Sequence, residues 1–251
     1  MKFAYEDLLS GDSIPVNGIA HFHSPHLYEL NPNKGIGAWK YNLYLNIMSW
    51  GQDEIIKFLR TATKRGWKAL DKAENITVFQ LITIIDYVRD LFIEGIGFFI
   101  DENIEWDKNE RCYITKDKST QERYGLIDEN NFEDVRDMIL QMNYINLGNK
   151  GKPTKFDSPA AEQLWKRAQQ YMKNQKKRAP DKKMALGNLI SKLCAGQTGY
   201  TLLNIYELTV FQFYDQFFQY QYLKAMSMND TVFCIHGGKK YDSQEWLKPL
   251  F

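Results

Sequence analysis

Two stretches of the chain share the string Thr-Val-Phe-Gln, and each string opens a run of apolar residues at helical spacing. The strings are residues 77–80 and 209–212. In the first run, from Thr77 to Ile100, polar residues form a narrow stripe and almost every other position is aliphatic or aromatic. A helix with so thin a polar stripe is typical of one surrounded by protein. The pattern therefore predicts a central core helix, with Thr77 as its N-cap.

The second run, from Thr209 to about Met228, predicts a long helix whose aromatic residues spread over roughly half of its circumference. Two interpretations fit this arc. The helix packs in the core against the first one, or part of the arc binds another chain. Tyr and Phe suit the second role because they give large contact areas with few rotatable bonds. The candidate partner-binding residues are Phe213, Tyr214, Phe217 and Phe218.

Shorter patterns predict the remaining elements. An Asn-Gly pair inside Ile14–Ile19 predicts a small hairpin. Alternating residues at 104–106 and 111–115, around a polar turn, predict a second hairpin. Asp157-Ser158-Pro159 is a strong helix start. Together these patterns predict a mainly α fold, in which a helical body with two long apolar helices carries a small β-hairpin insertion.

The predicted domain organisation follows from the two apolar helices. Residues 1–101 and 183–251 are expected to form the two halves of one helical body. Residues 102–182 are expected to form an insertion that contains the hairpin and a basic helix. A chain of 251 residues is long enough to bury an adequate core in this arrangement.

Charge and cysteine content narrow the class of protein. The formal net charge is +1, with 32 basic and 31 acidic residues, so no global field attracts nucleic acid or a membrane surface. Three distant cysteines without a CxxC spacing favour a reducing compartment. The most apolar stretch, Ile76–Ile100, is interrupted by charged residues and makes a poor transmembrane helix. We therefore expect a cytoplasmic protein that does not span a membrane.

A basic segment covers residues 166–183 and includes Lys173, Lys176, Lys177 and Arg178. Such a cluster can bind phosphates without sequence preference. It can also contact an acidic protein or remain a solvated linker. The near-neutral chain favours the solvated interpretation, and nucleic acid is not expected as the main partner.

Three histidines, His21, His23 and His26, lie close together near the N-terminus. In a strand His21 and His23 share a face, a spacing compatible with a metal ion. No neighbouring cysteine or carboxylate obviously completes a ligand set, so these residues are low-ranking metal candidates. The chain also lacks a P-loop, a GxSxG and an HExxH motif. We predict no catalytic residue and no cofactor, and hence a protein that is not an enzyme.

Two ends of the chain carry a family resemblance. The start, Tyr5–Gly11 followed by Ile14–Ile19, resembles the opening of proteins encoded in tail gene clusters of phages and prophages of Gram-positive bacteria. The run Leu208–Phe217, with Trp246–Leu250, is similar to the C-terminal helix and tail of phage tail- or baseplate-assembly chaperones. Together the two ends cover about a quarter of the chain.

This resemblance implies a chaperone-like, non-enzymatic protein that binds other tail or baseplate proteins during virion assembly. It would act in the host cytoplasm, and its presence in the virion is left open. The alternatives are a structural tail or baseplate subunit and a nucleic-acid-binding module that uses the basic segment. The oligomeric state is left open as well.

Overall fold

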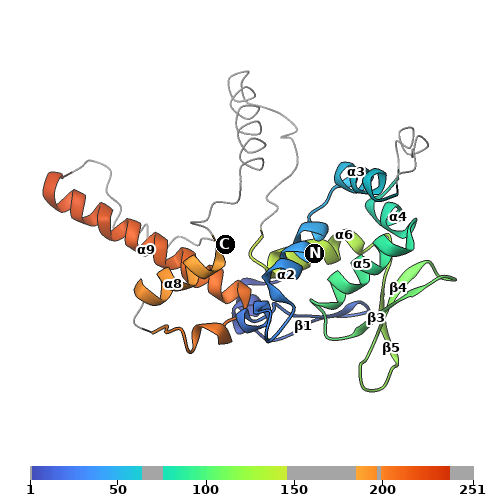
Figure 1. Ribbon diagram of the computed structural model, residues 1–251. Helices are drawn as coiled ribbons and strands as arrows, with labels where there is room; N and C mark the ends of the chain where they lie inside the picture. The colour runs from blue at the N-terminus through green and yellow to red at the C-terminus, as the bar shows by residue number, and fades with distance from the viewer. Residues whose placement is uncertain (1, 64–75, 146–184, 197–198, 238–251) are drawn as a thin grey trace. The chain divides into compact units, whose positions relative to one another are not determined.

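The computed structural model describes residues 2–63, 76–145, 185–196 and 199–237 of the chain (Figure 1). Contacts divide these residues into two compact units. The first unit holds the described residues up to 145 together with Tyr206–Gln216, and the second holds the described residues of 185–205 and 217–237. The predicted boundaries at 101 and 182 stay a prediction.

Helices make up about half of the described residues of the first unit. Gly95 marks the crossing of α2 and α5, because a Cβ atom added there would lie 2.9 Å from Met48 Cε. The missing side chain therefore lets the two helices approach closely. The helices of this unit are α1 (Tyr5–Ser10), η1 (Leu27–Leu30), α2 (Gly37–Met48), α3 (Gln52–Thr63), α4 (Val78–Thr83), α5 (Asp86–Gly97) and α6 (Phe132–Met142).

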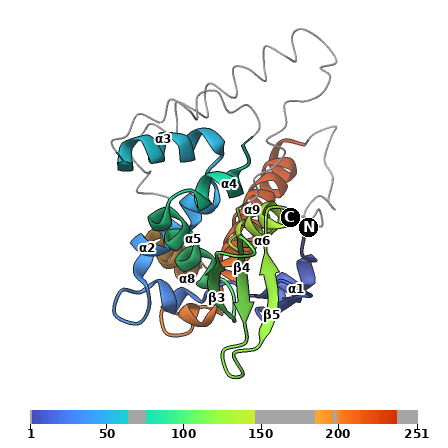
Figure 2. The same cartoon turned by 90° about the vertical axis from the view of Figure 1, so that its right-hand side faces the viewer.

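Two small antiparallel sheets belong to the same unit. The first is a hairpin of β1 (Ile14–Val16) and β2 (Ala20–Phe22), and Gly18 in its turn has a φ of 72°. The second has the order β3-β4-β5, with β4 in the middle (Figure 2). Its strands are β3 (Asn103–Asp107), β4 (Cys112–Lys116) and β5 (Arg123–Ile127). Both predicted hairpins are therefore present, and the second gains a third strand.

The predicted mainly α class with two long apolar helices is wrong, because the described residues form a mixed α/β structure. Besides the two sheets, the run 77–100 contains two helices, α4 and α5, separated at Ile84 and Ile85. Four successive β-branched residues, Ile82–Ile85, run into the break and include it, and such residues lose side-chain freedom in a helix. Ile85 adopts an extended backbone and becomes the N-cap of α5.

An aromatic cluster forms the core between the three-stranded sheet and its helices. The Phe79 ring lies 5.3 Å from the Phe132 ring and 5.8 Å from the Tyr113 ring, measured between centroids. The Trp106 and Phe92 rings extend the cluster at 5.1 Å from Tyr113 and 5.9 Å from Phe132. Edge-on and tilted pairs at these distances are favourable, so the cluster joins α4, α5 and α6 to the sheet.

The two sheets approach each other at a pair of glycines. The Leu126 amide donates to the Gly18 carbonyl at 3.0 Å, and the Thr115 hydroxyl donates to the Ile19 carbonyl at 2.5 Å. At Gly125 an added Cβ atom would collide with the backbone of Gly18. Only glycine therefore allows β5 to lie this close to the β1–β2 turn.

A buried arginine closes the C-terminal end of α2. The Arg136 side chain, on α6, donates from Nε to the Met48 carbonyl at 2.8 Å and from Nη2 to the Trp50 carbonyl. Its Nη1 atom donates to the Glu133 carboxylate at 2.8 Å. The guanidinium thus satisfies the last carbonyl of α2, which the helix itself leaves without a partner, and the Trp50 carbonyl just beyond the helix.

Candidate functional site

The long helix α9 (Val210–His236) begins at the second copy of the repeated string. The Thr209 amide donates to the Gln212 side chain at 2.9 Å, and the Gln212 amide donates to the Thr209 hydroxyl at 3.2 Å. Thr77 and Gln80 form the same capping box at the start of α4, so the predicted N-cap is confirmed. The repeated string is therefore a helix start used twice.

The first turns of α9 lie in the core of the first unit. The Val210 amide donates to the Pro25 carbonyl at 2.8 Å, and the Phe211 amide donates to the Ser24 hydroxyl at 3.2 Å. These bonds satisfy donors that every helix N-terminus leaves open. Val210, Phe211 and Phe213 are fully buried. This part of the helix holds the fold together.

A buried carboxylate lies in the same turns. Asp215 is 2% exposed and accepts a hydrogen bond from the Tyr5 hydroxyl at 2.8 Å. Nearby, the Tyr144 ring packs 5.2 Å from the Phe211 ring. Burial, and secondly the Asp215 charge, raise the pKa of Tyr144 to about 12, and burial also raises the pKa of Tyr214. Both phenols are therefore neutral at ordinary pH. We conclude that the residues packed around Asp215 stabilise the fold.

The four predicted partner-binding residues lie on this part of α9, but they do not form one exposed surface. Phe213 and Phe217 are buried, at 0% and 4% exposed. Tyr214 and Phe218 are half-buried. A partner could therefore reach only Tyr214 and Phe218 within the described residues, and a binding role for the four stays a prediction.

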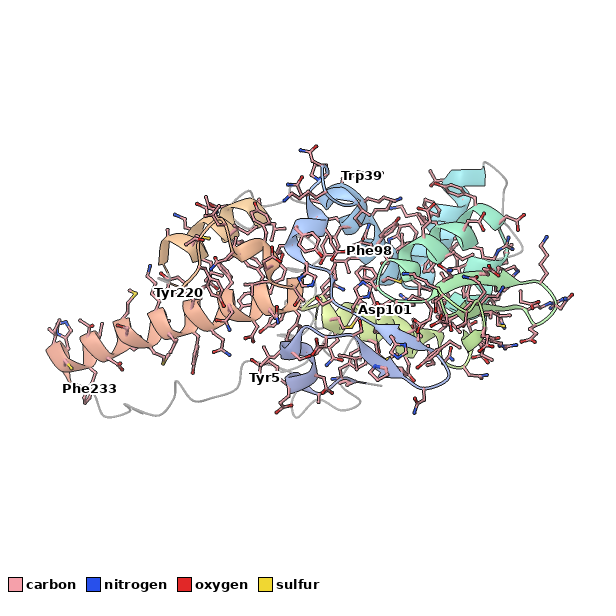
Figure 3. The ribbon with its side chains drawn as sticks, turned by 90° about the horizontal axis from the view of Figure 1, so that it is seen from below. Tyr5, Trp39, Phe98, Asp101, Tyr220 and Phe233 are labelled. Atoms are coloured by element: carbon pink, nitrogen blue, oxygen red, sulfur yellow. The ribbon has the colours of Figure 1, made fainter. Side chains whose placement is uncertain are left out.

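Exposed apolar residues lie further along the same helix. Met228, Val232 and Ile235 are 63%, 56% and 68% exposed. Their spacing of four and three residues places them on one side of the helix, and we call these three residues the α9 stripe. Figure 3 shows the side chains of this stretch, between the labelled Tyr220 and Phe233, standing off the helix. Sequence reasoning missed the stripe because it ended the helix near Met228, although the spacing was visible.

The second unit also contains α8 (Leu186–Gly196), which buries Leu189, Ile190 and Leu193. A Cβ atom added at Gly196 would collide with the Tyr220 hydroxyl, so the end of α8 lies directly on α9 at that point. The short helix η4 (Ile205–Glu207) precedes α9. Within the second unit, α8 therefore contacts α9 at Tyr220, about two turns before the α9 stripe.

Two of the three candidate histidines pair with separate carboxylates. His21 Nδ1 lies 2.5 Å from Glu102 Oε1, and the His21 amide donates to Oε2 of the same residue at 2.9 Å. His23 Nδ1 lies 2.9 Å from Asp101 Oδ1. The His21–Glu102 contacts join β2 to the segment after α5, where the Asp101 amide donates to the His21 carbonyl.

His26 has a different partner, since its Nδ1 atom lies 2.6 Å from the Glu207 carbonyl oxygen. Its ring also stacks on Tyr28. In the part of the chain that the structure describes, no group of three or more His, Cys, Asp or Glu residues is arranged to hold a metal ion. The histidines therefore do not come together as one ligand set there.

The candidate basic residues Lys173, Lys176, Lys177 and Arg178 lie outside the described residues, as does the terminal segment 246–250. The helices that are described include none long and apolar enough to cross a membrane.

Comparison with protein families gives one match. Residues 173–250 match the model of a family described as the YomV second domain. YomV is a protein of a phage region, so this partial and weak match associates the chain with phages. The match covers less than half of the chain and includes α8 and all of α9. No curated protein and no solved structure matches the chain.

Proposed function

We propose that this protein is a non-enzymatic assembly protein of a phage tail or baseplate, and that it binds other virion proteins in the host cytoplasm. The observation that carries the proposal is the α9 stripe, formed by Met228, Val232 and Ile235. Single apolar residues on a surface are ordinary, but a continuous apolar surface marks an interaction site.

The family match supports the phage part of this proposal, since it includes the whole of α9. The tail or baseplate assignment rests on the resemblance of the two chain ends. The stripe replaces Phe213 and Phe217 as the proposed contact, because a partner cannot reach two buried rings without opening the core.

The test is tagged co-purification from a host that carries the phage genes, with virion proteins identified by mass spectrometry. Val232→Glu places a charge in the middle of the stripe, and Ser227→Glu places the same charge elsewhere on α9, at another exposed position. We expect the wild type and Ser227→Glu to retain tail or baseplate proteins at high salt. Val232→Glu should lose them, because burying an unpaired carboxylate is costly.

Three outcomes would contradict the proposal. Equal recovery with both variants would exclude the stripe as the contact. Recovery of nucleic acid alone, lost at high salt, would favour the nucleic-acid-binding alternative. A fixed stoichiometry of the protein in purified particles would favour a structural virion subunit.

A further inference from the structure

We draw no further inference here: the strongest candidate, the side-chain cluster beside the Trp106 ring in which the buried atoms Tyr113 Oη on β4 and Arg89 Nε on α5 have no hydrogen-bond partner among the described residues, carries nothing, because nothing in that part of the structure shows a cavity or a ligand between the two atoms.

Discussion

Replacing Arg136 by Met removes the guanidinium that closes α2 while keeping a long side chain in its place. Arg136 is 4% exposed, and it donates to the carbonyls of Met48 and Trp50. In the variant neither carbonyl has this partner, and water has little access to Met48. We therefore expect Arg136→Met to destabilise the first unit far more than a surface substitution would.

The size of the loss follows from the bonds that are broken. Leaving a buried acceptor without a partner costs about 1–3 kcal/mol, and two carbonyls are affected. The ion pair with Glu133 adds little, about 0–1 kcal/mol, because that carboxylate is 63% exposed. The expected loss in the free energy of unfolding is about 3 kcal/mol in total. Arg136→Lys should recover part of it, since one ammonium cannot bond to both carbonyls with the same geometry.

Urea unfolding followed by tryptophan fluorescence tests this reasoning, since Trp50 and Trp106 both lie in the first unit. With an m value of about 2 kcal/mol/M, the midpoint should fall by about 1.5 M for Arg136→Met. Glu133→Gln is the control and should move the midpoint by less than about 0.5 M. Equal shifts for the two variants would refute the role assigned to the two carbonyls.

Three further predictions concern packing in the two units and the titration of one tyrosine. Gly125→Ala should destabilise the first unit by about 2 kcal/mol, because the Cβ atom meets the Gly18 backbone. Gly187→Ala should stabilise α8 by about 0.5–1 kcal/mol, because an added Cβ meets nothing within 4 Å there. Thermal melts measure both variants, and equal melting temperatures for the two would contradict both predictions. The pKa of Tyr144 is raised from 10.0 to about 12, so its contribution to stability is complete below pH 10 and is lost as the pH rises to about 12. Denaturation across this range should be less steep for Tyr144→Phe, and an identical profile would contradict the shift.

The α9 stripe shows what helical spacing can predict from the sequence and what it cannot. The spacing of Met228, Val232 and Ile235 is readable in the chain, and it places the three residues on one side of a helix. The same kind of spacing describes Phe213 and Phe217, which are buried. Periodicity tells which residues share a side of a helix, but burial depends on whether another element covers that side.

The sequence by itself determined the local features of this protein. The N-cap at Thr77 and the turn at Gly18 depend on bonds and dihedral angles within a few residues, so short patterns were enough to predict them. Only the tertiary structure decided that β5 pairs with β4 and that Gly125 lies against Gly18 of the other sheet. These outcomes depend on contacts between residues far apart in the chain, which no local pattern contains.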